Sequence, residues 1–380
     1  MNGRPVIYRE GVSCEIIDES SDAGGAVICV NCTDITIRDT TTKAIEDGIA
    51  LHYCDGVTVE NVTTDMATSG LLVYDSDNVS VRGGSTFGPN LRNGIKTEEI
   101  SGFLVEENEI SCQERGSGIR LATAEDITIT NNTISGGRNS VGVIGMLVIN
   151  SRVTGNTITD GTDIGIGIGY GDELVVSGNT AESPVCGIYV NSVWNTLVSG
   201  NTIRCNDTGY GMVISGDGLE VTGNIAENCS IQATMELNDS VVSKNSFSGA
   251  EYPAIVVWPE GGDVFVYRND FVLTDTEPTP GISSASATGT AVMPTKTMDL
   301  ADIIRSTGLP DDEISLRELS MEAVACGMTD TAATALPPEA EMKSAAWHSP
   351  GRGDLLVLRT SIHPNDGQLL EHLHRHRHHP

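Results

Sequence analysis

The sequence predicts an all-β protein, a single-stranded parallel β-helix in which each repeat forms one coil of a solenoid. Two repeating features and one absence favour this fold. An asparagine recurs about every 23 residues, and a small residue followed by alternating apolar residues recurs with the same period. The 3.6-residue periodicity of an amphipathic helix is missing from the repeats, which leave little room for a helix within a coil.

The asparagine repeat defines the coils. Phrases such as Thr-Gly-Asn-Thr-Ile (154–158) and Ser-Gly-Asn-Thr-Ile (199–203) place the amide at one corner, where a preceding glycine permits positive φ. Stacked asparagines can pass hydrogen bonds between coils. We expect such a ladder at Asn108, Asn132, Asn156, Asn179, Asn201, Asn224, Asn245 and Asn269. The position continues backwards as Thr40, Val62 and Gly84. This makes about eleven coils, stacked about 4.8 Å apart over roughly 50 Å.

A small residue opens a short strand in each coil. These residues are Gly48, Gly70, Gly94, Gly118, Gly142, Gly165, Gly187, Gly211, Thr234 and Ala254. The first and third residues after each are apolar, with Thr97 and Gly145 as exceptions. Because side chains of a strand alternate between its two faces, we expect the first and third positions in the core and the second and fourth outside.

Two other repeat architectures fit less well. A leucine-rich repeat requires a Leu-x-x-Leu-x-Leu pattern, which is absent, and a propeller requires a period of about 40 to 50 residues.

The charge of the chain excludes two classes of partner. The 380 residues carry 52 Asp and Glu against 22 Lys and Arg, a net charge of −30. Nucleic acid and anionic membrane surfaces would be repelled. The sequence contains no apolar run of 18 residues, so it predicts no transmembrane helix. Only five of the basic residues are lysine, a pattern that favours either halophilic adaptation or a secreted protein from a GC-rich genome.

The nine cysteines suggest one covalent link. Cys29-x-x-Cys32 resembles half a zinc site, but no second pair follows, and buried cysteines also serve as small apolar side chains. Cys32 and Cys54 occupy equivalent positions on neighbouring coils, where a spacing of about 4.8 Å permits a disulfide.

Two candidate sites lie on the outer face of the strands that follow the small residue. His52, Tyr74, Lys96, Glu98 and Arg120 fall on four successive coils, with Asp75 beside them. They have the residue types for acid–base catalysis on a uronate, although a solvated strand face with chance ion pairs explains them too. A second, more neutral ligand-binding patch consists of Tyr189, Asn191, Glu236 and Trp258, with Glu236 assigned to the second position of its strand.

The Asn-Gly-Arg-Pro-Val-Ile-Tyr opening, the stretch Val-Asn-Cys-Thr-Asp-Ile-Thr-Ile-Arg (30–38) and the Ser-Gly-Asn-Thr-Ile phrases resemble the right-handed, pectin-lyase-like β-helix family of the NosD accessory proteins and archaeal surface proteins. The resemblance covers about residues 1–273. It implies carbohydrate-binding or sugar-hydrolase repeats and an extracellular or cell-surface location. The N-terminus has no signal peptide pattern, which suggests a start site downstream of the true one.

The repeat ends near residue 273. Residues 274–298 are rich in Pro, Ser, Thr and Ala and predict a linker. Within 299–380, short helices are predicted over 299–307 and 312–326, and the rest is expected to be irregular or disordered. The tail ends in a histidine cluster that could bind copper or another divalent metal: His372, His374, His376, His378 and His379.

Three functions remain open from the sequence. The leading one is a NosD-like extracellular scaffold that binds a polysaccharide or cell-surface glycan without catalysis and requires no cofactor. The first alternative is a polysaccharide lyase, epimerase or hydrolase acting on acidic glycans, although the paired-aspartate and His-Gly motifs of polygalacturonases and the Asp-Pro-His-Asp motif of mannuronan epimerases are missing. The second alternative, copper-site assembly, follows from the histidine tail and the NosD resemblance.

Overall fold

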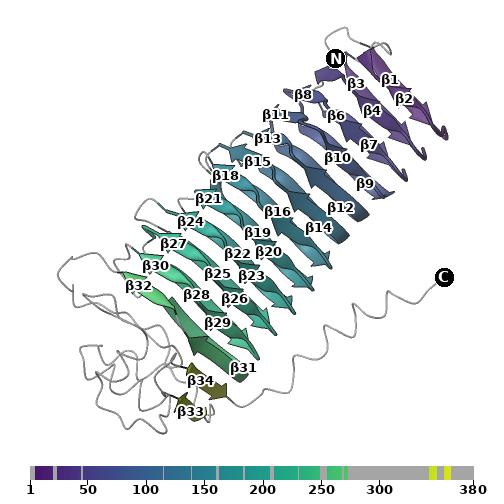
Figure 1. Ribbon diagram of the computed structural model, residues 1–380. Helices are drawn as coiled ribbons and strands as arrows, with labels where there is room; N and C mark the ends of the chain where they lie inside the picture. Colours follow the sequence, from purple (N-terminus) through teal and green to yellow (C-terminus); the bar gives the residue numbers. More distant parts are fainter. Residues whose placement is uncertain are drawn as a thin grey trace, which may run out of the picture.

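The fold is a parallel β-solenoid, seen here in a computed structural model (Figure 1). The structure describes residues 5–19, 24–43, 46–113, 115–137, 139–159, 162–182, 185–205, 209–229, 231–248, 255–267, 269–272, 342–348 and 355–360. Each coil contributes up to three strand segments, which stack on their equivalents in the next coil as three lines of parallel strands. Among the described residues, no helix is long and apolar enough to cross a bilayer.

Line A holds the strands that follow the small residue. Its members are β1 (Val6–Glu10), β3 (Ala26–Val30), β6 (Asp47–His52), β9 (Ser69–Asp77), β12 (Asn93–Glu106), β14 (Ser117–Thr130), β16 (Ser140–Ile149), β19 (Thr162–Asp172), β22 (Cys186–Trp194), β25 (Tyr210–Asp217), β28 (Ile231–Asn238) and β31 (Ile255–Tyr267). The pairings Ile49 with Leu71 and Leu71 with Ile95 keep the first position in register from coil to coil.

Lines B and C complete each coil. Line B contains β2 (Ile16–Ile17), β4 (Thr36–Arg38), β7 (Thr58–Glu60), β10 (Ser80–Arg82), β17 (Arg152–Thr154), β20 (Val175–Ser177), β23 (Leu197–Ser199), β26 (Glu220–Thr222) and β29 (Val241–Ser243), and the C-terminal parts of β12, β14 and β31 belong to it as well. Line C contains β5 (Thr41–Lys43), β8 (Thr63–Asp65), β11 (Thr86–Asn90), β13 (Glu109–Cys112), β15 (Thr133–Gly136), β18 (Thr157–Thr159), β21 (Thr180–Glu182), β24 (Thr202–Arg204), β27 (Ile225–Glu227), β30 (Ser246–Ser248) and β32 (Asp270–Val272). Line C is an 11-stranded sheet, in agreement with the eleven coils expected between residues 40 and 269.

The core is a column of aliphatic side chains enclosed by the three lines. Ile49 and Leu51, at the first and third positions of β6, are fully buried, and equivalent residues of the later coils stack on them. Thr97, an exception to the apolar pattern, is also fully buried, and its hydroxyl donates to the carbonyl oxygen of Arg120 at 3.4 Å. Burial on one face of each strand fixes the register, because a shift by one residue would expose the whole apolar set.

The asparagine ladder forms the corner before line C. Asn156 Nδ2 donates to Asn179 Oδ1 at 3.0 Å and to the carbonyl oxygen of Ile129 at 2.9 Å. Asn156 Oδ1 in turn accepts from the backbone N–H and from Nδ2 of Asn132, both at 3.0 Å. The side-chain bonds continue from Asn108 to Asn269, and all eight amides are buried. The ladder therefore satisfies polar groups that have no access to water.

The glycines that open line A let two lines of strands pack closely. A Cβ atom added to Gly94 would lie 2.2 Å from Ile110 Cγ2 and 2.7 Å from the carbonyl oxygen of Gly118. Gly118 is confined in the same way, by Ile134 and by Gly142. The small residue is thus required because the start of line A lies against line C and against the next coil.

The disulfide lies elsewhere than the sequence predicts. Cys205 and Cys229 are joined, with Cα atoms 4.8 Å apart, whereas Cys32 and Cys54 are buried free thiols. The expected register is correct, since the N–H of Asp55 donates to the carbonyl oxygen of Cys32 on the neighbouring coil. The thiol of Cys32 donates to the carbonyl oxygen of Val30, and the thiol of Cys54 to those of His52 and of Cys29 on the neighbouring coil. The predicted link between Cys32 and Cys54 was therefore wrong.

The C-terminal region contains two strands that the sequence analysis did not predict, β33 (Met342–His348) and β34 (Leu355–Thr360). They pair antiparallel, and β34 also pairs antiparallel with the C-terminal, line B part of β31 (Figure 1). An added strand of this kind covers an otherwise unpaired sheet edge. The predicted linker (274–298), the predicted helices (299–307 and 312–326) and the histidine tail (372–379) lie outside the described residues.

Candidate functional site

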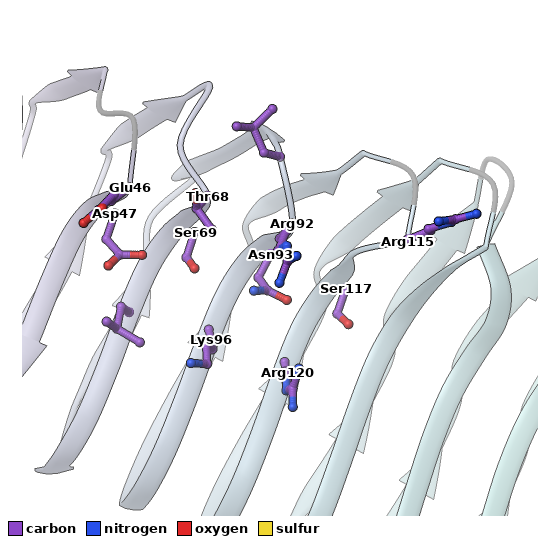
Figure 2. Close-up of a pocket in the computed structure, with 12 residues that line it drawn as sticks. Glu46, Asp47, Thr68, Ser69, Arg92, Asn93, Lys96, Arg115, Ser117 and Arg120 are labelled. Atoms are coloured by element: carbon purple, nitrogen blue, oxygen red, sulfur yellow. The ribbon is translucent and has the colours of Figure 1, made fainter. Parts of the chain in front are cut away.

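A groove of about 740 Å³ runs across the opening ends of four line A strands, β6, β9, β12 and β14. Its polar row is Asp47, Ser69, Asn93 and Ser117, which pair with one another in successive coils. Each of these residues stands directly before the glycine that opens its strand. Because those glycines hold the backbone close to line C, the row is fixed at one level along the groove (Figure 2).

Four basic side chains line the same groove. Lys96 and Arg120 occupy the second position of β12 and β14 and are register partners, so they lie about one 4.8 Å coil apart. Arg92 comes from the turn before β12, and Arg115 from the turn before β14. Figure 2 shows Lys96 and Arg120 on neighbouring strands, further along than the polar row.

The groove reverses the sign of the surrounding charge. The four cations face two carboxylates, Glu46 and Asp47, in a chain whose net charge is −30. Lys96 is partly covered, and its Nζ lies 3.8 Å from Glu98 Oε2, an ion pair too long and too exposed to neutralise it fully. Such a local excess of positive charge attracts an anion that the rest of the surface repels.

Asp47 is the carboxylate at one end of the polar row. Burial raises the pKa of Asp47 above the ordinary value for an aspartate. A hydrogen bond with the Ser69 side chain and the charges of Lys96 and His52 oppose that rise, whereas Glu46 adds to it. The net result is a carboxyl group that holds its proton to higher pH than an exposed aspartate, beside a cation.

The structure divides the first predicted cluster in two. Lys96 and Arg120 line the groove, whereas His52, Tyr74 and Glu98 form a separate row at the fourth position and do not line it. The rings of His52 and Tyr74 have centroids 6.0 Å apart, and Tyr53 meets Tyr74 edge to face at 5.7 Å.

Asp75 and its equivalents form the corner beyond that row. Asp75 follows Tyr74 with a φ of 46°, and its carboxylate is exposed. Glu99 occupies the same corner position on the next coil, with a φ of 56°. The charge of Glu99 is the main cause that raises the pKa of the Tyr74 phenol, which therefore stays neutral over a wider pH range.

The second predicted patch has a different register from the expected one. Glu236 pairs with Ser215 and with Trp258, which places it at the fourth position rather than the second. Asn191 lies in the same row, because Ser215 Oγ donates to Asn191 Oδ1 at 2.6 Å. Tyr189 is at the second position of β22, as expected. The error came from choosing Thr234 as the small residue, whereas Thr234 is the partner of Val213.

Sequence reasoning missed most of the groove. It identified Lys96 and Arg120 but not Asp47, Asn93 or the two arginines in the preceding turns. A usable signal was present in the residue directly before each opening glycine. That residue is polar in four successive coils, at Asp47, Ser69, Asn93 and Ser117, and apolar in the next two, at Val141 and Ile164.

The described residues do not fit a resident metal ion. Within this part of the chain, no three His, Cys, Asp or Glu side chains gather closely enough to bind one. The histidines that could supply such ligands (372–379) lie outside it.

The chain belongs to the NosD family. The family model described as periplasmic copper-binding protein (NosD) matches residues 3–151, 112–238 and 150–277. No curated protein matches the chain in sequence.

Three solved structures are similar to this chain. PfbA, a surface adhesin of Streptococcus pneumoniae, is 13% identical with a TM-score of 0.44, over 71% of this chain and 80% of that one. A mutant of DFA-IIIase from Arthrobacter chlorophenolicus A6, in complex with DFA-III, is 13% identical with a TM-score of 0.48, over 67% and 75%. A mutant of the periplasmic alginate epimerase AlgG is 12% identical with a TM-score of 0.43, over 71% and 70%. No residue role passes from them to this chain.

Proposed function

We propose that this NosD-family chain is a periplasmic or cell-surface protein that binds an acidic, uronate-containing glycan in the groove. The observation that carries the proposal is the cluster of Arg92, Lys96, Arg115 and Arg120 in a protein of net charge −30. Each arginine guanidinium can donate two parallel hydrogen bonds to one carboxylate, which a lysine cannot do.

The geometry of the groove suits a linear oligosaccharide. Over four coils the polar row supplies one carboxyl group and, from side chains buried beneath the groove, two hydroxyl groups and one amide. The basic pair Lys96 and Arg120 supplies charge along the same direction. A sugar unit is about as long as the coil spacing of about 4.8 Å, so neighbouring units would meet equivalent groups on neighbouring coils. The volume of about 740 Å³ lies within the usual range for small-ligand sites, about 300–1,000 Å³.

The test compares two matched double variants. Lys96→Ala with Arg120→Ala removes one lysine and one arginine from the groove. Lys43→Ala with Arg204→Ala removes the same residue types from line C, where Lys43 pairs with Asp65 and Arg204 with Glu227. Binding of alginate and pectate oligomers is measured by isothermal titration calorimetry at low salt.

The groove variant is expected to lose binding, and the line C variant to keep it. Neither is expected to shift the thermal midpoint appreciably, because exposed ion pairs contribute about 0–1 kcal/mol. Wild-type protein that binds none of these oligomers, or a line C variant that loses binding equally, contradicts the proposal.

A second function, acid–base processing of the bound glycan, is favoured by one observation. Asp47 lies at the edge of the basic groove, and its raised pKa makes its carboxylate a stronger base than an exposed aspartate. In a β-elimination its carboxylate would take the proton at C5, and the C5–H electron pair would form a C4–C5 double bond. The bond from C4 to the glycosidic oxygen would break, and that oxygen would leave with its electron pair and receive a proton from the Asp47 carboxyl group or from water. Absorbance of that unsaturated product, measured with wild type and with Asp47→Asn, decides between binding alone and catalysis.

A further inference from the structure

The row of second-position residues continues beyond the basic groove. Arg120 pairs with Ile144 of β16, Ile144 with Gly167 of β19, and Gly167 with Tyr189 of β22. Three coil steps therefore separate Arg120 from Tyr189, a distance of about 14 Å along the axis. The two ends of this row are a cation and an aromatic ring on the same outer face.

This part of line A differs from the groove in charge. The fourth position holds Met146, Gly169 and Asn191, and the corner position after it holds Leu147, Tyr170 and Ser192. The corner position held Asp75 and Glu99 in the earlier coils. Over β16, β19 and β22, the second, fourth and corner positions thus carry neither acid nor base. An anionic ligand meets no repulsion from them, in contrast to most of this acidic surface.

The same region exposes apolar side chains. Met146 is 47% exposed, Leu147 40%, Tyr170 39% and Tyr189 36%. Exposed apolar residues that are contiguous, rather than scattered, mark interaction sites more often than chance surface residues do. A tyrosine ring beside uncharged surface is suited to stacking against the apolar face of a sugar ring.

Gly167 is itself buried and puts no side chain at the middle of the row. A Cβ atom added there would meet only Ile164 Cγ2 at 3.5 Å and the carbonyl oxygen of Val143 at 3.9 Å, which are ordinary contacts. Gly94 and Gly118, by contrast, have no room for one. Packing against the fold therefore does not require a glycine at 167. The missing side chain makes a low point on the outer face between its register partners Ile144 and Tyr189.

We propose that the glycan held in the basic groove continues across β16, β19 and β22, passes over the low point at Gly167 between Ile144 and Tyr189, and stacks a sugar ring on Tyr189. We call this surface the platform, defined by Ile144, Met146, Gly167, Gly169 and Tyr189. The inference rests on the proposed function, since it extends the same ligand. It adds that the preferred ligand is a polymer rather than a short oligomer, and that it runs from the groove toward β22.

The experiment measures affinity against oligomer length. Uronate oligomers of two and six units are titrated against wild type, Gly167→Leu and Tyr189→Ala. Gly167→Leu puts a bulky side chain in the path, and its Cβ atom makes only ordinary contacts with the fold. Tyr8→Ala is the matched control, because Tyr8 is an exposed tyrosine on β1, beyond the other end of the groove.

Wild type is expected to bind the six-unit oligomer at least tenfold more tightly than the two-unit one. Gly167→Leu and Tyr189→Ala should each remove most of that gain and leave binding of the two-unit oligomer unchanged, while Tyr8→Ala keeps both. The platform proposal is wrong if wild type binds the two lengths with equal affinity. It is also wrong if only Tyr8→Ala abolishes the tighter binding of the six-unit oligomer.

Two further outcomes distinguish a failed groove from a failed platform. If neither oligomer binds wild type, the proposed function itself fails, and the platform fails with it. If Gly167→Leu changes the sedimentation of the protein, converting a dimer to a monomer, the platform is a contact between two copies of the chain, and the inference is wrong.

Discussion

The corner ladder and the outer face of line A are built on the same repeat but behave differently. At the corner, one residue type serves eight successive coils from Asn108 to Asn269, with the same bonds between each pair. On the outer face, the second position changes from Lys96 and Arg120 to Ile144, Gly167 and Tyr189 over five coils. The repeat is kept where the backbone depends on it and lost where the side chain faces solvent.

The difference shows where function can reside in a solenoid. Each coil contacts chiefly its neighbours, so a position that every coil needs for stacking accepts few residue types. Ser85, for example, takes the place of asparagine and accepts from the N–H of Val62 at 3.1 Å. A position that no coil needs can differ from one coil to the next and create a local site. The groove at β6 to β14 and the platform at β16 to β22 both consist of such positions.

The largest effect should come from breaking the ladder. Asn156→Ala removes the acceptor of the backbone N–H and Nδ2 of Asn132, and it also removes the donor to Ile129 O and to Asn179 Oδ1. Each buried polar group left without a partner costs about 1–3 kcal/mol, so the total should exceed the cost of one ordinary hydrogen bond. Urea denaturation followed by circular dichroism measures the loss.

A control on the outer face isolates the effect of burial. Asn191→Ala removes the acceptor of a 2.6 Å bond from Ser215, but both residues are only partly buried, so water can replace the lost partner. Its cost should be about 1 kcal/mol or less. Equal losses for Asn156→Ala and Asn191→Ala would contradict the distinction between the two regions.

A smaller effect is expected from a pair of glycine substitutions within line A. Gly118→Ala brings a Cβ atom to 2.3 Å from Ile134 Cγ2 and 2.6 Å from the carbonyl oxygen of Gly142, and overpacking of this kind costs about 1–3 kcal/mol. Gly167→Ala meets no such contact and should be neutral or slightly stabilising, because it restricts the unfolded chain. Thermal midpoints of the two variants supply the comparison. A destabilised Gly167→Ala would show that the platform glycine has a packing role.

The sequence predicted the repeated parts of the molecule and only pieces of the site. The asparagine period and the apolar alternation sufficed for the fold because each coil repeats the same physical requirement. The predicted register was wrong at Glu236, because Thr234 resembles the usual small residue but pairs with Val213. The sequence did not predict the groove because Arg92 and Arg115 lie in turns outside the repeated strands, where residue spacing does not predict the direction of a side chain. β34 was not predicted because it does not belong to the repeat and its partner, β31, is about 90 residues away in sequence.

The smallest effect on stability concerns Asp47, which opens a line A strand and lines the groove. Burial raises its pKa, so the folded protein binds its proton more tightly than the unfolded chain does. Stability is therefore lost as the pH rises from the unfolded pKa, about 3.9, through the folded one, and the destabilisation persists above it. Asp47→Asn removes that loss. Because the side chain is only half-buried, the gain at neutral pH should be below about 1 kcal/mol.

The same proton should affect the ligand more clearly than the fold. Protonation of Asp47 removes one negative charge from the groove, so wild type should bind an anionic glycan more tightly as the pH falls through the raised pKa. The change expected from one screened charge is about two- to fivefold in Kd. A sulfated oligosaccharide serves as ligand because its own charge does not titrate in this range. The difference between wild type and Asp47→Asn then isolates the contribution of Asp47, because every other group is common to the two proteins. Identical pH profiles for the two proteins would show that Asp47 does not face the bound anion, so that the basic side chains of the groove would hold it without help from this carboxyl group.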